Sequence, residues 1–191
     1  MNQRNEEVPD FHPLHILDNL LLSFEKGFSS TNTQRLVQIS EFLFGSQSKK
    51  SSLLESSLEI LDQSAEHDLI HLAPVRLLIE KQSKRSVFIV RGSRPNRRNT
   101  SLSNVPEYIC TMGIGSGRCK KIAAGNISYH CSCRSFYERS KVDRLALCKH
   151  LLAVRLAPFL NTGDGRLIYA EQEVDAEEWI RIYTHVSMEA L

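Results

Sequence analysis

Three cysteines and one histidine, arranged as two closely spaced pairs, are the residues of this chain best suited to chemistry. Cys131 and Cys133 form the first pair, Cys148 and His150 form the second, and fourteen residues separate the pairs. Three thiolates and an imidazole suit a tetrahedral zinc ion. Catalytic zinc sites keep one position open for water, whereas this set already supplies four protein ligands. The pattern therefore predicts one structural zinc ion and no catalytic metal.

The two pairs need different backbone conformations to reach the same ion. In a strand, residues i and i+2 point to one side, so Cys131 and Cys133 can bind together while His130 points away. In a helix interior, residues two apart lie about 200° apart around the axis. We therefore expect Cys148 and His150 to flank the beginning of a helix, where the partial positive charge favours a thiolate at Cys148.

These ligands also carry a resemblance to a known family. Tyr129-His-Cys-Ser-Cys133, followed by Leu147-Cys-Lys-His-Leu-Leu-Ala153, resembles the SWIM zinc finger, in which C-x-C precedes a C-x-H that opens a helix. With Glu41-Phe-Leu-Phe-Gly-Ser46 ahead of the strands, residues 35–160 resemble the small SWIM-domain subunit of the Shu complex. The chain departs from the family in having Arg134, where proline often follows the second cysteine, and in its long loops.

The resemblance implies a non-enzymatic adaptor in the nucleus. Subunits of this kind form hetero-oligomers with RecA-like recombinase paralogues. They promote assembly of the recombinase filament on single-stranded DNA, in homologous-recombination repair and in meiosis. The zinc ion would then join the strand end to the helix at 148–159 and fix the surface for the partner. Two alternatives stay open, a stand-alone DNA-binding zinc module and a substrate receptor of a ubiquitin ligase.

The hydrophobic pattern predicts an α+β fold around this site. Apolar residues at helical spacing predict N-terminal helices over 14–28, 31–45 and 52–65, the last with Leu53, Leu54, Leu58 and Leu61 on one side. From Pro74 the pattern predicts a short antiparallel β-meander with strands at 75–81, 86–91, 107–112 and 127–131.

Two further helices complete the expected fold. One begins near Cys148 and breaks at Pro158. The other covers 171–189, with Val174, Trp179, Ile180 and Tyr183 as its apolar positions. The expected organisation is a flexible N-terminus (1–12), a helical region (13–70), the β-meander with the zinc finger (74–160, core 127–159) and an acidic C-terminal helix (161–191).

The composition is that of a folded chain. Of its 191 residues, 41% are hydrophobic and 24% are charged, which excludes an intrinsically disordered chain. No run approaches 18 apolar residues, so no membrane span is expected. The polar start, Met1 to Pro9, does not read as a secretory leader. The five cysteines are therefore expected as reduced thiols or metal ligands rather than as a disulfide framework.

Charge is distributed unevenly along the chain. Residues 1–80 carry a net −6, 81–121 a net +9, 122–159 a net +4 and 160–191 a net −5. This pattern favours a polyanion as partner for the middle, or a match between opposite charges. The loops at 92–106 and 113–126 supply the candidate nucleic-acid contacts Arg94, Arg97, Arg98, Arg118, Lys120 and Lys121; a solvated flexible loop or a match to an acidic partner is the alternative explanation of these charges.

The remaining features argue for a binding protein. Phe42, Leu43 and Phe44 are consecutive and cannot all face one core, so they are expected to contact a partner or the C-terminal helix. His67 and His71 lack the glutamate of a metalloprotease helix, and Gly113–Gly117 does not complete a nucleotide-binding loop. No nucleophile, general base or phosphate loop is found, so neither an enzyme nor a small-molecule substrate is expected.

Overall fold

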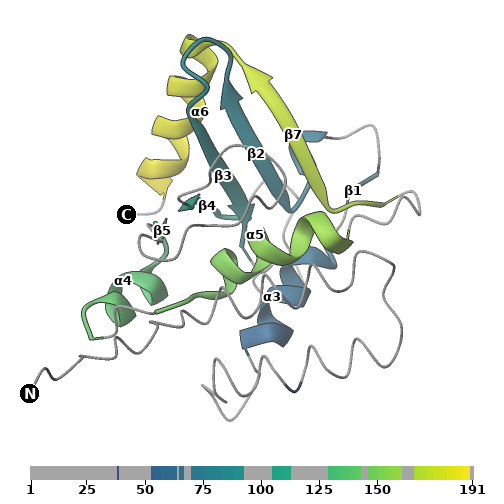
Figure 1. The fold of residues 1–191 in the computed structure, drawn as a ribbon, viewed down its shortest axis with the longest axis vertical. Coiled ribbons are helices and arrows are strands. Elements are labelled where there is room, and N and C mark those ends of the chain that lie inside the picture. Colours follow the sequence, from purple (N-terminus) through teal and green to yellow (C-terminus); the bar gives the residue numbers. More distant parts are fainter. Residues whose placement is uncertain are drawn as a thin grey trace, which may run out of the picture.

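The structure described here is a computed structural model. It describes Gln38 and residues 53–63, 65–66, 70–92, 105–112, 129–142, 146–160 and 166–189. These residues form an α+β fold, as predicted (Figure 1). The elements are α3 (Leu53–Leu61), β1 (Ala65–Glu66), the 3₁₀-helix η1 (Ile70–Leu72), β2 (Val75–Glu80), β3 (Ser86–Arg91), β4 (Glu107–Met112), β5 (Tyr129–Cys131), α4 (Arg134–Ser140), α5 (Lys149–Leu160), β6 (Arg166–Leu167), β7 (Tyr169–Val174) and α6 (Ala176–Glu189).

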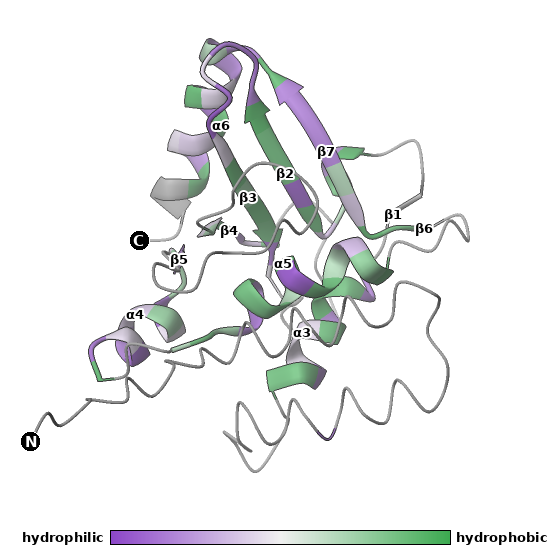
Figure 2. Cartoon of the chain, in the orientation of Figure 1, coloured by the Kyte–Doolittle hydropathy of each residue, from purple (hydrophilic) through white to green (hydrophobic). Residues whose placement is uncertain are grey.

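A five-stranded sheet in the order β5-β4-β3-β2-β7 is the centre of the fold. The strands β2 to β5 pair antiparallel with their successive neighbours, which confirms the predicted meander. The prediction was incomplete, however, because β7 adds to β2 in parallel and makes the sheet mixed. The central strand β3 is mostly hydrophobic, whereas β7, on the edge, is largely hydrophilic (Figure 2).

Each face of the sheet has its own helical cover. On one face, Phe88, Val90 and Cys110 belong to a core shared with Leu151 and Leu152 of α5, and α3 packs against α5. On the other face, α6 covers β2 and β4 and completes a smaller core (Figure 1). That smaller core consists of Leu78, Val87, Ile89, Ile109 and Val186, with Trp179 and Ile182 packed against it. The predicted metal ligands lie on the α5 side.

The C-terminal segment differs from the prediction of one helix over 171–189. Its first part is the strand β7, and α6 begins only at Ala176. Asp175 ends the strand and opens the helix, because its carboxylate accepts a hydrogen bond from the Glu178 N–H at 2.9 Å. The predicted apolar stripe was also misplaced: Val174 is buried in β7, while Ile180 is 62% exposed.

Three other helices depart from expectation in detail. In α3, Leu58 is 38% exposed and Ser57 is buried in its place. The helix α5 does not break at Pro158 as predicted but continues to Leu160, so the proline interrupts only its last turn. The short helix α4 was not predicted; it fills the beginning of the spacer between the two ligand pairs.

Several predictions fall outside the described residues. The N-terminus 1–12, the helix 14–28 and, except for Gln38, the helix 31–45 are among them. Most of the two basic loops lies there too. Within the part of the chain that the structure does describe, no helix is long and apolar enough to cross a membrane.

Candidate metal centre

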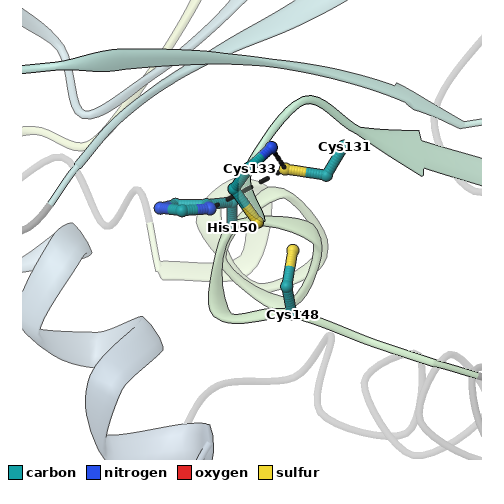
Figure 3. A group of neighbouring side chains, drawn as sticks. All are labelled: Cys131, Cys133, Cys148 and His150. Atoms are coloured by element: carbon teal, nitrogen blue, oxygen red, sulfur yellow. Dashed lines mark hydrogen bonds between the residues drawn. The ribbon is translucent and has the colours of Figure 1, made fainter. Parts of the chain in front are cut away.

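Cys131, Cys133, Cys148 and His150 come together at one point of the fold (Figure 3). Their four candidate ligand atoms all lie within 4.8 Å of one another, and all four residues are buried. Two come from the end of β5 and the residue that opens α4, and two from the beginning of α5. The structure therefore brings together all four residues that the sequence singled out.

The first pair owes its geometry to extended backbone. Cys131 is the last residue of β5, and Cys133 is the N-cap of α4 with φ −71° and ψ 143°. This extended conformation keeps the alternation of a strand beyond the end of β5, so both thiols face the cluster. The N–H of Phe136 donates to Sγ of Cys133 at 3.3 Å. His130 is exposed and outside the cluster, as predicted, with its ring edge-on to Phe136.

Ser132, between the two thiols, fixes the strand end in place. Its N–H donates to the carbonyl of Ile109 at 3.0 Å, and its hydroxyl accepts from the Ile109 N–H at 3.0 Å. Two hydrogen bonds thus join this residue to β4 and hold Cys131 and Cys133 on either side. Sequence reasoning missed this role. The sequence did contain a signal for it. Ser132 is the middle residue of C-x-C, its side chain faces away from the two thiols, and its hydroxyl can accept a hydrogen bond from the neighbouring strand.

The second pair lies at a helix start, as predicted. The carbonyl of Cys148 accepts the first helical hydrogen bond of α5 from the Leu152 N–H at 3.1 Å, which makes Cys148 the N-cap residue. His150 follows in the first turn. The guanidinium of Arg139, on α4, donates to the carbonyl of Leu147 at 3.0 Å. This bond joins the residue before Cys148 to the helix that Cys133 caps.

A buried serine connects the metal centre to the N-terminal helix. The hydroxyl of Ser57, on α3, lies 3.0 Å from the carbonyl of Lys149 and 2.7 Å from that of Leu53. Lys149 stands between the ligands Cys148 and His150, so this contact holds the second pair against α3. It also explains why Ser57, rather than Leu58, faces the core.

The imidazole of His150 presents one nitrogen to the thiols. Its Nδ1 lies 3.7 Å from Sγ of Cys131 (Figure 3). Ligands bound at 2.0–2.3 Å to a tetrahedral ion are separated by about 3.3–3.8 Å, so this distance fits two ligands of one ion. The other nitrogen, Nε2, is buried and has no hydrogen-bond partner among the described residues. Nδ1 is therefore the imidazole nitrogen that faces the thiols and could bind an ion together with them.

The thiols differ in their affinity for protons. Hydrogen bonds from Cys131 and then Cys148 hold the pKa of Cys133 well below its usual value. The pKa of Cys148 is raised, first by its hydrogen bond with Cys131. Without an ion, Cys133 is thus the thiol whose surroundings favour the thiolate, while the thiolate expected at Cys148 stays a prediction. An ion must displace the protons of Cys131 and Cys148.

The donor set and its burial together allow one metal ion to bind. Three sulfurs and one nitrogen are soft to borderline ligands, and four of them complete a tetrahedron without water. The residues that surround them, such as Leu147, Leu151 and Phe136, are apolar and buried. Such a site can stabilise the fold by joining β5, α4 and α5.

The other candidate site residues contribute nothing to this centre. Arg94, Arg97, Arg98, Arg118, Lys120 and Lys121 lie outside the described residues, as do Phe42, Leu43 and Phe44. Arg91, which precedes the first basic loop, belongs to β3, is buried, and donates to the carbonyl of Leu72 at 2.9 Å. Cys110 is a buried residue of β4. Comparison of the chain with protein-family models, with curated proteins and with solved structures finds no match.

Proposed function

We propose that Cys131, Cys133, Cys148 and His150 bind one zinc ion with a structural role. The observation that carries this proposal is the convergence of four buried donor atoms within 4.8 Å of one another. Three thiolates favour zinc over harder cations such as magnesium and calcium. Four protein ligands leave no position for a substrate or a water, so the proposed ion holds the fold together and has no catalytic role, in keeping with the non-enzymatic protein that we propose.

The wider role that we propose is that of an adaptor subunit in a Shu-like complex. The protein would bind one or more RecA-like recombinase paralogues in the nucleus and promote filament assembly on single-stranded DNA in recombination and meiosis. Support comes from the resemblance of the ligand motif to the SWIM finger. The order of elements, a meander followed by a strand end with two cysteines and a helix opened by Cys-x-His, agrees with that resemblance.

Affinity purification of the tagged full chain, with zinc measured on the same sample, tests both proposals. We expect one zinc ion per chain and a RecA-like partner, both lost in Cys133→Ser and both kept in His130→Ala. Neutralising Arg97 and Arg98 is expected to leave the partner bound. A cullin scaffold in place of the recombinase paralogue would support the ubiquitin-ligase alternative and contradict the adaptor. Protein without metal would contradict the zinc site.

Direct binding of single-stranded DNA is a second candidate function, favoured by one face of α4. Arg134, Tyr137 and Lys141 follow each other at helical spacing and are all exposed. The ring of Tyr137 is 60% exposed, and Nζ of Lys141 lies 4.0 Å from its centroid. An exposed aromatic ring flanked by cations suits a base with its neighbouring phosphates.

Titration of the purified protein with a fluorescent single-stranded oligonucleotide tests this second candidate. Tyr137→Ala should weaken binding about tenfold, whereas Tyr183→Ala, which removes a tyrosine from the acidic helix α6, should not. Replacing Arg134 and Lys141 with alanine should reduce the slope of log K against log salt concentration by about 1.4. Equal effects of the two tyrosine variants would exclude this face as the DNA contact.

A further inference from the structure

A fifth element of the metal centre is Cys110, a cysteine on the neighbouring strand. Cys110 lies directly opposite Cys131 in the register of β4 and β5. The hydrogen bonds of the adjacent pair, between Ile109 and Ser132, make Cys110 and Cys131 a non-hydrogen-bonded pair. In such pairs the Cα atoms are about 4.5 Å apart and the side chains approach most closely. Both side chains are buried, with relative exposures of 0% and 1%.

We propose that Cys110 donates a hydrogen bond from its thiol to the Cys131 thiolate, and so positions and stabilises this ligand. The inference rests on the proposed zinc site. It makes Cys110 a positioning residue of the metal centre rather than a metal ligand. Four nearer residues already complete the tetrahedron, and Cys110 is not among the donor atoms that lie within 4.8 Å of one another.

The charge of the centre explains why such a donor is needed. Three thiolates around one divalent ion leave a net charge of about −1 in a buried site. Buried negative charge is stabilised by hydrogen-bond donors, because water cannot reach it. Cys133 receives the N–H of Phe136 at 3.3 Å, and Cys131 receives the N–H of Cys133 at 3.5 Å. The thiol of Cys110 supplies a second donor to Cys131.

The surroundings of Cys110 leave its thiol no other polar role among the described residues. Its strand neighbour across the sheet on the other side is Phe88, and the core that holds it is otherwise made of apolar side chains and the metal ligands. The register of β4 and β5 and the burial of both residues place the two thiols against each other on this face of the sheet. When an ion takes the proton from Cys131, Cys110 is the partner that still carries one.

Two substitutions give opposite results according to the role of Cys110. Cys110→Val keeps an apolar side chain of similar size but removes the donor, while Cys110→Ser keeps a donor. Zinc release to a chelator from the folded full chain, at fixed pH, should be about tenfold faster for Cys110→Val. For Cys110→Ser it should stay within about threefold of the unchanged protein. If valine were tolerated and serine released zinc faster, Cys110 would be a packing residue and the inference would be wrong.

A measurement on the unsubstituted site covers the case in which these variants do not fold. In a Cys119→Ser background, Cys110 is the one cysteine that keeps its proton in the zinc-bound protein, because the other three are ligands. The infrared S–H band should then lie at lower wavenumber than that of a free thiol in an apolar solvent. A band at the free-thiol position would overturn the inference.

Cobalt substitution separates failure of this inference from failure of the zinc proposal. Three thiolates and one imidazole around cobalt should give tetrahedral d–d bands and strong sulfur-to-cobalt charge-transfer bands. Their absence from the unchanged protein would refute the metal centre itself. Their presence, together with unchanged charge-transfer bands and zinc release in Cys110→Val, would refute only the role of Cys110.

Discussion

Tyr108 stacks on the imidazole of His150, with ring centroids 4.2 Å apart and an angle of 27° between the planes. Tyr108 is a residue of β4, so the contact fixes the ring of the last ligand against the sheet. This tyrosine therefore packs, and its packing partner is the proposed metal ligand His150.

Gly92→Ala should disturb this stack without touching a ligand. A Cβ at position 92 would lie 3.0 Å from Cε2 of Tyr108 and 3.1 Å from both Cγ and the carbonyl oxygen of Pro106. Because the Pro106 carbonyl is backbone, Tyr108 and its strand must shift. We expect a loss of about 1–3 kcal/mol in the free energy of unfolding, measured by chemical denaturation of the zinc-bound protein. Tyr108→Phe, which keeps the ring, is the control; a Gly92→Ala protein of unchanged stability would contradict the packing described.

Removing a ligand should cost both the ion and much of the stability. Cys133→Ser or His150→Ala is expected to lose zinc and to lower the free energy of unfolding by several kcal/mol, about 3 or more, because metal binding and folding are coupled. Metal content and melting temperature are the measurements. The control is His130→Ala, because His130 is adjacent to Cys131 but exposed; this variant should keep its zinc and its melting temperature. Full metal content in either ligand variant would show that the ligands are wrongly assigned.

Zinc affinity should fall as the pH is lowered. In the ion-free protein, hydrogen bonds made by the protonated thiols, to Cys110 for Cys131 and to Cys131 for Cys148, raise the pKa values of Cys131 and Cys148, so at neutral pH protons compete with the ion at both thiols. The pKa of Cys133 is lowered by hydrogen bonds from its neighbours, so it has already lost its proton. Binding then releases about two protons, and the Kd should rise about 100-fold per pH unit lowered. A chelator competition series from pH 8 to pH 6.5 checks this; a slope of three protons would show that Cys133 is protonated.

Ser132→Ala should weaken the metal centre from outside the ligand set. The substitution leaves the buried N–H of Ile109 without its acceptor, which costs about 1–3 kcal/mol. The strand end that carries Cys131 and Cys133 then loses one of its two ties to β4. Thermal unfolding of the zinc-bound protein is the measurement, and the exposed Ser135→Ala is the control. Equal stability of the two variants would mean that the Ser132 hydroxyl has no structural role.

The sequence predicted the local features of the site well because its chemistry depends on short spacings. Cys131 and Cys133 need only an extended backbone, and Cys148 and His150 need only a helix start. The strands Ser86–Arg91 and Glu107–Met112 were also correct to the residue, since both are continuous runs with β-branched and aromatic side chains.

The errors arose where long-range packing decided the structure. Tyr169–Val174 has two glutamates and a glutamine, a composition typical of helices, and becomes a strand because β2 offers it a parallel partner. Ser57 faces inward because its hydroxyl lies within hydrogen-bond distance of a carbonyl of α5, a contact that the sequence of α3 alone does not reveal. The role proposed for Cys110 could not be predicted, because the register that places it against Cys131 cannot be derived from either strand alone.

The position of β7 has a consequence for how the chain is made. All four ligands leave the ribosome before β7 does, because β7 follows α5 in the sequence. Until β7 arrives, the outer side of β2 is a row of unpaired backbone groups that can pair with another nascent chain. An ion bound at this stage can therefore stabilise the metal centre, but the sheet still lacks its last strand. A chain that stops after α5 should carry its metal and still aggregate.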